Sequence, residues 1–117
     1  MLESELSYSG AVAPFDRRSH ARYTVQIPLE LLCEGESESL HLVTTDLSHN
    51  GCYVKISTPL AVGTRIQITL WMDQHRIVAH GRIVTRHPEF GNGIMFLKFE
   101  ADGEPILHAY LNAISDC

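Results

Sequence analysis

Hydrophobic residues fall on every second position along most of the chain, a pattern typical of strands that bury one face. In the first such stretch, residues 24–31, the alternating apolar residues are Val25, Ile27, Leu29 and Leu31. The same period of two recurs, between turn residues, in residues 40–46, 51–57, 66–70, 76–86 and 93–99. The pattern predicts an all-β protein of six short strands, arranged as a barrel or a sandwich.

Two single residues and one dipeptide within this pattern predict local backbone geometry. Pro28 cannot donate to a strand ladder, so the first strand is expected at a sheet edge, or with a bulge at the proline. Gly81 lies in the middle of the fifth stretch, where it predicts a bulge or a sharp bend. Asn50 and Gly51 precede the third strand and predict a hairpin, because both residue types tolerate positive φ.

The period changes near the C-terminus. Leu107, Tyr110, Leu111 and Ile114 follow the i, i+3, i+4, i+7 spacing of an amphipathic helix, and Pro105 suits its first turn. We expect this apolar stripe to pack on the strands, because a terminal helix most readily buries its apolar side on its own domain. The alternative is a face that binds a partner protein.

Residues 1–15 mix small and acidic residues around isolated apolar ones, which predicts a flexible N-terminal tail. Docking of this tail onto the rest of the protein is the alternative. Residues 16–117 are expected to form a single domain, because about 100–150 residues is the commonest domain size.

The net charge of −5 argues against a protein that coats nucleic acid or an anionic membrane, so any anion site must be local. The three cysteines lack the paired spacing of a zinc or redox site and are expected as free thiols. The N-terminus has no positive charge followed by an apolar run, and no stretch is long and apolar enough to span a membrane. These features predict a soluble cytoplasmic protein without membrane insertion.

Two short clusters carry candidate chemistry. Arg18 and Arg22 are four positions apart, with Arg17 adjacent, so two guanidinium forks can converge on a phosphate or on the O6 and N7 atoms of guanine. Asp46 and Ser48 are two apart at a strand end, where a carboxylate and a hydroxyl on one face can bind paired N–H donors such as those of guanine. Each cluster alone also fits a solvated turn.

Together, and in this order, the two clusters resemble the motifs of the PilZ domain family. The chain has Arg-x-x-x-Arg at residues 18–22, before the first strand, and Asp-x-Ser-x-x-Gly at residues 46–51, at the end of the second. Gly-Ile-Met-Phe at residues 93–96 is similar to the family's glycine–aliphatic–x–aromatic strand. The resemblance covers roughly residues 16–114, and both motifs in order on a six-strand pattern are fairly specific.

The resemblance implies a six-stranded antiparallel β-barrel with a C-terminal α-helix that binds the bacterial second messenger cyclic di-GMP. Carried over by position, Arg18 and Arg22 hold phosphate and the guanine Hoogsteen edges. Asp46 and Ser48 read the other guanine donors, and Gly51 lets the turn approach closely. Arg17, just outside the motif, is expected as an additional contact.

The function expected on this basis is that of a non-catalytic receptor with no cofactor besides its ligand. Because the arginines precede the first strand, binding can fold the N-terminal arginine segment across the barrel and offer a changed surface to a downstream protein partner or a second copy of the chain. The alternative of a different class is a ligand-independent protein-interaction adaptor of the same fold.

Enzymatic and polymer-binding functions have less support. The seven histidines include no pair at the i+3 or i+4 spacing of a helical metal site, so a metal-dependent enzyme is disfavoured. Ser48 and His49 point to opposite faces of extended backbone, which argues against a Ser–His–Asp triad. Trp71 and Phe90 could form a stacking platform for single-stranded nucleic acid, but the acidic balance disfavours it, and Trp71 is expected to pack on the barrel.

Overall fold

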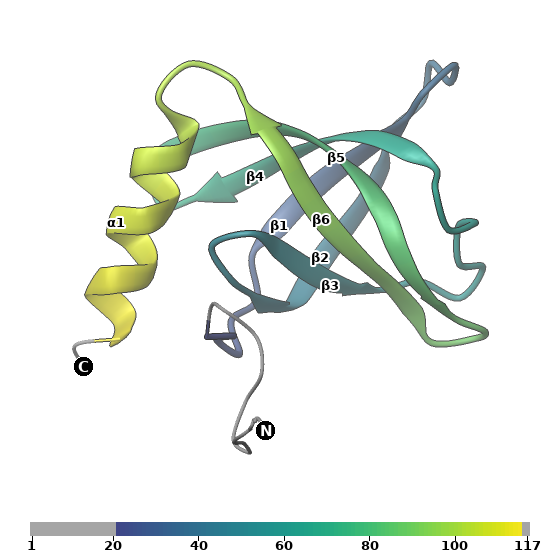
Figure 1. Ribbon diagram of the computed structural model, residues 1–117, viewed down its shortest axis with the longest axis horizontal. Coiled ribbons are helices and arrows are strands. Elements are labelled where there is room, and N and C mark those ends of the chain that lie inside the picture. Colours follow the sequence, from purple (N-terminus) through teal and green to yellow (C-terminus); the bar gives the residue numbers. More distant parts are fainter. Residues whose placement is uncertain (1–20, 116–117) are drawn as a thin grey trace, which may run out of the picture.

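The computed structural model of the protein describes residues 21–115 and folds them into a closed barrel with one terminal helix (Figure 1). The neighbour order of the antiparallel strands is β1-β2-β3-β6-β5-β4, closed by pairing of β1 with β4. This confirms the predicted six-stranded barrel and C-terminal helix. The elements are β1 (Pro28–Cys33), β2 (Leu40–Leu47), β3 (Gly51–Lys55), β4 (Arg65–Met72), β5 (His75–His87), β6 (Gly91–Phe99) and α1 (Gly103–Ser115).

The expectation that Pro28 marks an edge strand or a bulge is wrong. A closed barrel has no edge, and the proline is accommodated as the first residue of β1, opposite Val43. The alternating residues before it lie outside the strand ladder. The Thr44 side chain holds them, since its Oγ1 accepts from Ile27 N at 2.9 Å and donates to Val25 O at 2.6 Å.

The core fills the barrel and continues under the helix. Inward residues of the strands, such as Leu31, Ile68 and Ile77, are fully buried. Leu107 and Leu111 of α1 are also fully buried, and Figure 1 shows the helix at one end of the barrel. Tyr110 and Ile114 pack against the same core, so the predicted core role of the helical stripe is confirmed.

Gly81 lies at one of two register shifts between β5 and β6, as predicted. A Cβ atom at this position would come within 2.2 Å of the Met95 carbonyl oxygen, so the two strands approach each other more closely than a side chain allows. The glycine therefore lets the long strand bend into the barrel wall.

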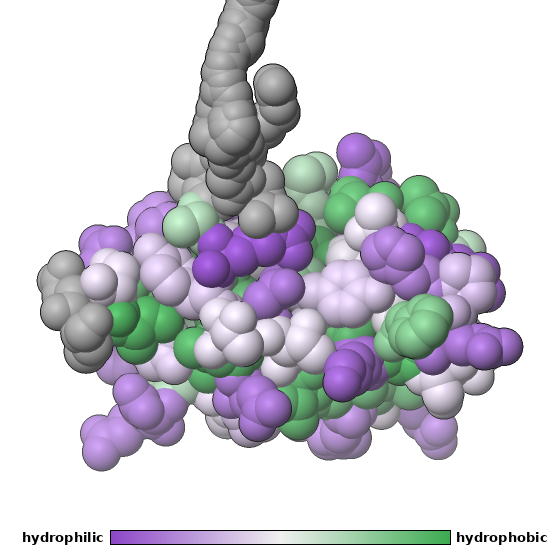
Figure 2. Space-filling view, turned by 90° about the horizontal axis from the view of Figure 1, so that it is seen from below, coloured by the Kyte–Doolittle hydropathy of each residue, from purple (hydrophilic) through white to green (hydrophobic). Residues whose placement is uncertain are grey.

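The outer surface shows no single apolar patch on the face seen in Figure 2, where hydrophobic and hydrophilic side chains are interspersed. The expected packing of Trp71 is only partial, because the ring is 43% exposed and the Arg76 guanidinium lies 5.9 Å from its centroid. Trp71 lies on β4 opposite Arg76, near the start of β5, whereas Phe90 lies in the turn after the end of β5, so they form no common platform. Within residues 21–115, no helix is long and apolar enough to cross a membrane.

One buried polar residue joins a loop to the barrel and was not singled out from the sequence. Asn92 in β6 is fully buried, and its Oδ1 accepts from Leu60 N at 2.8 Å. Its Nδ2 lies 3.0 Å from Leu60 O and 3.2 Å from Thr85 O, to which it donates. The Asn92 amide thus forms hydrogen bonds with both the N–H and the C=O of Leu60, in the loop between β3 and β4. Without these bonds, the two backbone groups would lose hydrogen bonds to water when the loop packs on the barrel.

Cys52 is a second buried group with an unusual environment. Its side chain is 3% exposed on β3. Burial raises the pKa of the thiol to about 12, from an ordinary value of 9.0. The Asp46 carboxylate adds to the increase in pKa, and the Arg22 guanidinium opposes it. The neutral thiol therefore behaves as a small core side chain rather than a nucleophile.

Substitution of Asn92 tests the loop anchor. Asn92→Ala removes a fully buried amide and leaves the partly buried N–H and C=O of Leu60 without this partner, so the free energy of unfolding should fall by about 2 kcal/mol or more in urea denaturation. Asn112→Ala is a matched control, because Asn112 is exposed on α1 and offers only its backbone carbonyl to Ser115. A loss below about 0.5 kcal/mol for Asn92→Ala would contradict the assignment.

The Cys52 thiol predicts a pH dependence of stability. Below pH 9.0 the thiol is protonated in both folded and unfolded states, whereas above it the unfolded state releases the proton first. The Cys52 contribution to the free energy of unfolding should therefore fall by up to about 1.4 kcal/mol per pH unit above that value. Urea denaturation between about pH 8 and about pH 10.5 should give a flatter profile for Cys52→Ala than for the unsubstituted protein. Parallel profiles would contradict the prediction.

Candidate ligand-binding site

Arg22 of the first predicted cluster lies beside Asp46 of the second, at the end of β2. Tyr23 and Leu47 form an isolated antiparallel bridge, with N–H to O distances of 2.8 and 2.9 Å. This bridge places Arg22 beside Asp46, and Arg22 Nη1 lies 3.1 Å from Asp46 Oδ1. The two side chains are 41% and 27% exposed, so the ion pair lies at the surface, open to a ligand. Residues that are 24 positions apart thus share one site.

Arg17 and Arg18 lie outside the described residues. Their expected contacts with phosphate and guanine stay predictions. Arg22 is therefore the only predicted arginine contact that lies within the described residues.

Ser48 uses its polar atoms within the hairpin turn. Its hydroxyl lies 2.9 Å from Asn50 Oδ1 and 3.2 Å from Gly51 O, and its single proton can serve one of them at a time. Its N–H donates to Gly51 O at 2.8 Å, and the residue is 5% exposed. Ser48 thus stabilises the turn that follows Asp46, and a ligand that binds its hydroxyl has to compete with these contacts.

Gly51 is required for close packing of two strands, a role that the sequence did not reveal. The predicted hairpin does not use the tolerance of Asn50 and Gly51 for positive φ, because the positive φ angles of the described residues fall elsewhere. A Cβ atom at Gly51 would lie 2.2 Å from the Ile94 carbonyl oxygen, so the glycine lets β3 lie against β6. The hairpin itself is formed as predicted, with Leu47 opposite Cys52.

Sequence reasoning missed Tyr53, which the strand register places directly opposite Asp46. Directly opposite residues of an antiparallel pair lie on one face with Cβ atoms about 4.5–5.5 Å apart. The Tyr53 hydroxyl lies 2.8 Å from Nδ1 of His87, and the two rings are 5.7 Å apart. Arg22, Asp46, Tyr53 and His87 thus form a continuous row across the outer surface of the barrel.

The hairpin also contacts the helix. His49 in the turn and His108 of α1 have ring centroids 4.3 Å apart at an angle of 66°. A hollow of about 400 Å³ lies beside this pair, lined also by Phe96, Lys98 and Glu104. The turn that carries Ser48 and Gly51 is therefore in contact with α1.

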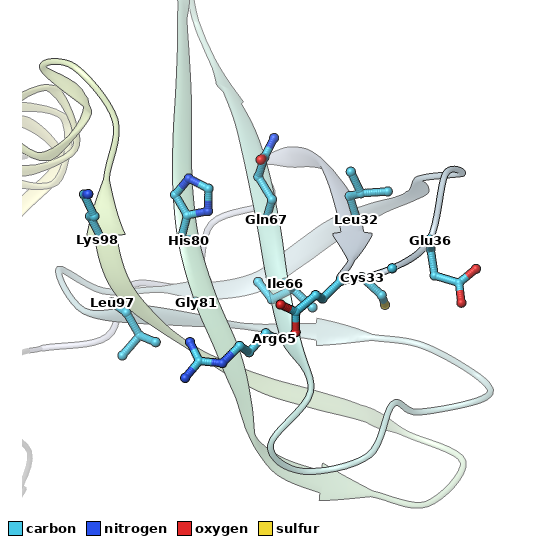
Figure 3. A pocket seen from close by; sticks show the side chains of 12 residues that line it. Leu32, Cys33, Glu36, Arg65, Ile66, Gln67, His80, Gly81, Leu97 and Lys98 are labelled. Carbon is cyan, nitrogen blue, oxygen red and sulfur yellow. The ribbon is translucent and has the colours of Figure 1, made fainter.

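A larger hollow of about 460 Å³ lies away from both motifs, on the outer face of β1, β4, β5 and β6 (Figure 3). Its described lining includes cations such as Arg65 and Lys98, the acidic Glu34 and Glu36, and no Phe, Tyr or Trp. None of the predicted site residues that the structure describes borders it. Across residues 21–115, no group of three His, Cys, Asp or Glu side chains is arranged to hold a metal ion.

Comparison with known proteins agrees with the fold and the motifs. The PilZ domain family model matches residues 16–113, whereas no curated protein matches. The PilZ domain of CeSA from a cellulose-synthesizing bacterium is 28% identical, over 67% of this chain and 82% of that one, with a TM-score of 0.56. The Bacillus subtilis inhibitor of motility (MotI/DgrA) is 14% identical, over 82% of this chain and 49% of that one, with a TM-score of 0.67, and supports the fold alone.

The expected family resemblance is thereby confirmed. The matched region includes both motifs, all six strands and most of the helix. Proteins of this family are binding and regulatory domains rather than catalysts. The chain belongs to the PilZ domain family, a family of cyclic di-GMP receptors.

Proposed function

We propose that this protein binds cyclic di-GMP on the outer surface of the barrel at the end of β2. The observation that carries the proposal is the ion pair of Arg22 with Asp46, which joins the arginine segment to the hairpin. The proposed contacts are Arg17, Arg18, Arg22, Asp46, Ser48 and Gly51. No cofactor is needed, because the ligand supplies the phosphates and guanines that these groups recognise.

The chemistry of the site suits this ligand. An arginine fork can donate two parallel hydrogen bonds to a phosphate or to the O6 and N7 atoms of guanine, while the Asp46 carboxylate can accept from its N1 and N2 protons. Exposed ion pairs contribute only about 0–1 kcal/mol to stability. The Arg22–Asp46 pair can therefore open toward a ligand at little cost.

Ser48 and Gly51 act mainly through position. Gly51 keeps the hairpin against β6, so that Asp46 is presented from a rigid wall. The hydroxyl of Ser48 can exchange its bond to Asn50 or Gly51 for one to the ligand without moving the turn. This rigid half contrasts with the Arg22 side chain, which can change rotamer.

The signal passes through the arginine segment. Ligand binding draws residues 16–22 across the barrel surface, and the resulting surface is offered to a protein partner or to a second copy of the chain. A receptor for this messenger works in the bacterial cytoplasm, where the messenger is made.

Calorimetric titration with cyclic di-GMP tests the proposal. The unsubstituted protein should bind at micromolar concentrations, and Arg22→Ala, Arg18→Ala and Asp46→Ala should each bind at least about ten-fold more weakly, because each removes a charge-assisted hydrogen bond. Arg76→Ala is the matched control, since Arg76 contacts Trp71 away from the site. Absence of heat, or equal binding by Arg22→Ala and Arg76→Ala, rules the proposed site out and favours a ligand-independent adaptor.

Amide hydrogen exchange tests the movement of the segment. Tyr23 N already donates to Leu47 O at 2.8 Å, so its exchange should be slow with or without ligand. Saturating cyclic di-GMP should slow exchange in residues 14–22, because the bound arginines order the backbone that carries them. Unchanged exchange in residues 14–22 at saturation would contradict the switch while leaving ligand binding intact.

A further inference from the structure

A hollow of about 500 Å³ lies on the other side of Tyr53 from Asp46. Its walls come from β3, from the chain that follows β3, and from the turn between β5 and β6. The lining residues are Tyr53, Lys55, Ile56, Ser57, Glu89 and Phe90. Two aromatic rings, one ammonium group and one carboxylate thus surround one space, and this set of groups suits a nucleobase with an attached phosphate.

The hollow adjoins the candidate site through Tyr53. Asp46 is directly opposite Tyr53, and Lys55 follows Tyr53 by two positions on the same strand. Residues i and i+2 of a strand share a face, and two residues advance by about 6.8 Å. The hollow therefore begins one side chain beyond the Asp46 carboxylate, within reach of a ligand that has two bases.

Tyr53 is held in a fixed position between the two spaces. Its hydroxyl lies 2.8 Å from His87 Nδ1, and its ring lies over β6, where a Cβ atom at Gly91 would come within 3.0 Å of Tyr53 Cε2. The glycine leaves room for the ring, and the histidine fixes its outer end. A half-buried ring held in this way can stack on a base without losing side-chain entropy.

Phe90 and Glu89 lie in a turn that is anchored to the barrel. Phe90 N donates to His87 O at 3.0 Å, and Phe90 O accepts from Ile56 N at 3.0 Å. The backbone is thus fixed, yet the Phe90 side chain is 71% exposed and contributes nothing to the core. Glu89 has φ of 69°, a backbone conformation that is uncommon for residues other than glycine. A glycine would be less strained at this position, yet the chain carries a carboxylate there.

We propose that this hollow is a second base subsite, in which Tyr53 and Phe90 stack on one guanine of the ligand. The subsite rests on the proposed function and extends it beyond the two motifs. Glu89 accepts from the N1 and N2 protons of that guanine, as Asp46 does for the other. Lys55 lies beside the phosphate that links the two halves.

The hollow of about 460 Å³ in Figure 3 lacks these features. Among residues 21–115 its lining includes no Phe, Tyr or Trp ring on which a base can stack, and none of its charged residues belongs to β2 or β3. The hollow at Tyr53 is lined by fewer residues, and four of them have a defined role toward a guanine nucleotide, namely Tyr53, Lys55, Glu89 and Phe90.

The experiment compares cyclic di-GMP affinities by calorimetry. Phe90→Ala and Tyr53→Ala should each weaken binding by about 5- to 150-fold, the usual effect of losing one base–aromatic stack. Tyr53→Phe keeps the ring and should stay within about two-fold. Trp71→Ala is the matched control, because it removes an exposed aromatic ring at the far end of β5 and should not change affinity.

Glu89→Gly separates ligand contact from structure. Glycine accepts positive φ freely, so this variant should keep or raise the thermal stability while its affinity for cyclic di-GMP falls. Thermal unfolding checks that Tyr53→Ala remains folded. Phe90→Ala is expected to fold normally, because Phe90 is not part of the described core.

The outcomes separate the subsite from the proposed function. Weakened binding by Phe90→Ala and Glu89→Gly, with Trp71→Ala unchanged, supports the subsite. If the unsubstituted protein binds and Arg22→Ala weakens binding, but Phe90→Ala and Glu89→Gly do not, the subsite is wrong and the proposed function stands. If the unsubstituted protein does not bind cyclic di-GMP, the proposed function is wrong and the subsite is excluded with it.

Discussion

The candidate site depends on how the chain before β1 is attached to β2. Thr44 exchanges two side-chain hydrogen bonds with Val25 and Ile27, and Leu47 exchanges two backbone bonds with Tyr23. These bonds replace a regular ladder, which Pro28 could not complete. They fix where the arginine segment leaves the barrel, and so they bring Arg22 to Asp46. Without this attachment the two motifs would be close only by chance.

Barrel closure and the site share the same glycines. Gly51 lets β3 approach β6, and Gly91 leaves the space in which the Tyr53 ring lies. A side chain at either position would separate the strands or displace the ring. The position of Tyr53 next to Asp46 therefore depends on tight strand packing, and a substitution that opens the barrel would alter the site without touching a ligand contact.

The sequence predicted the elements better than their connections. Alternation and the helical stripe predicted six strands and α1, because both patterns are local and the core confirms them. The same alternation at residues 24–27 could not distinguish a strand ladder from a segment held by Thr44. Tyr53 was missed because its place opposite Asp46 depends on a register shift between Thr44 and Asp46, and a shift of one residue moves a side chain to the other face.

The contrast between a rigid wall and weak surface contacts decides how such a site can respond. The barrel is held by buried side chains such as Leu31 and Ile77, whose burial contributes about 1.5–3 kcal/mol each. The Arg22–Asp46 pair is an exposed contact that contributes about 0–1 kcal/mol, whereas a hydrogen bond to a charged group of a ligand contributes about 1.5–3 kcal/mol. A ligand can therefore replace the ion pair but cannot rearrange the barrel. The change on binding must then be confined to the arginine segment and the side chains around it, which is where a partner would detect it.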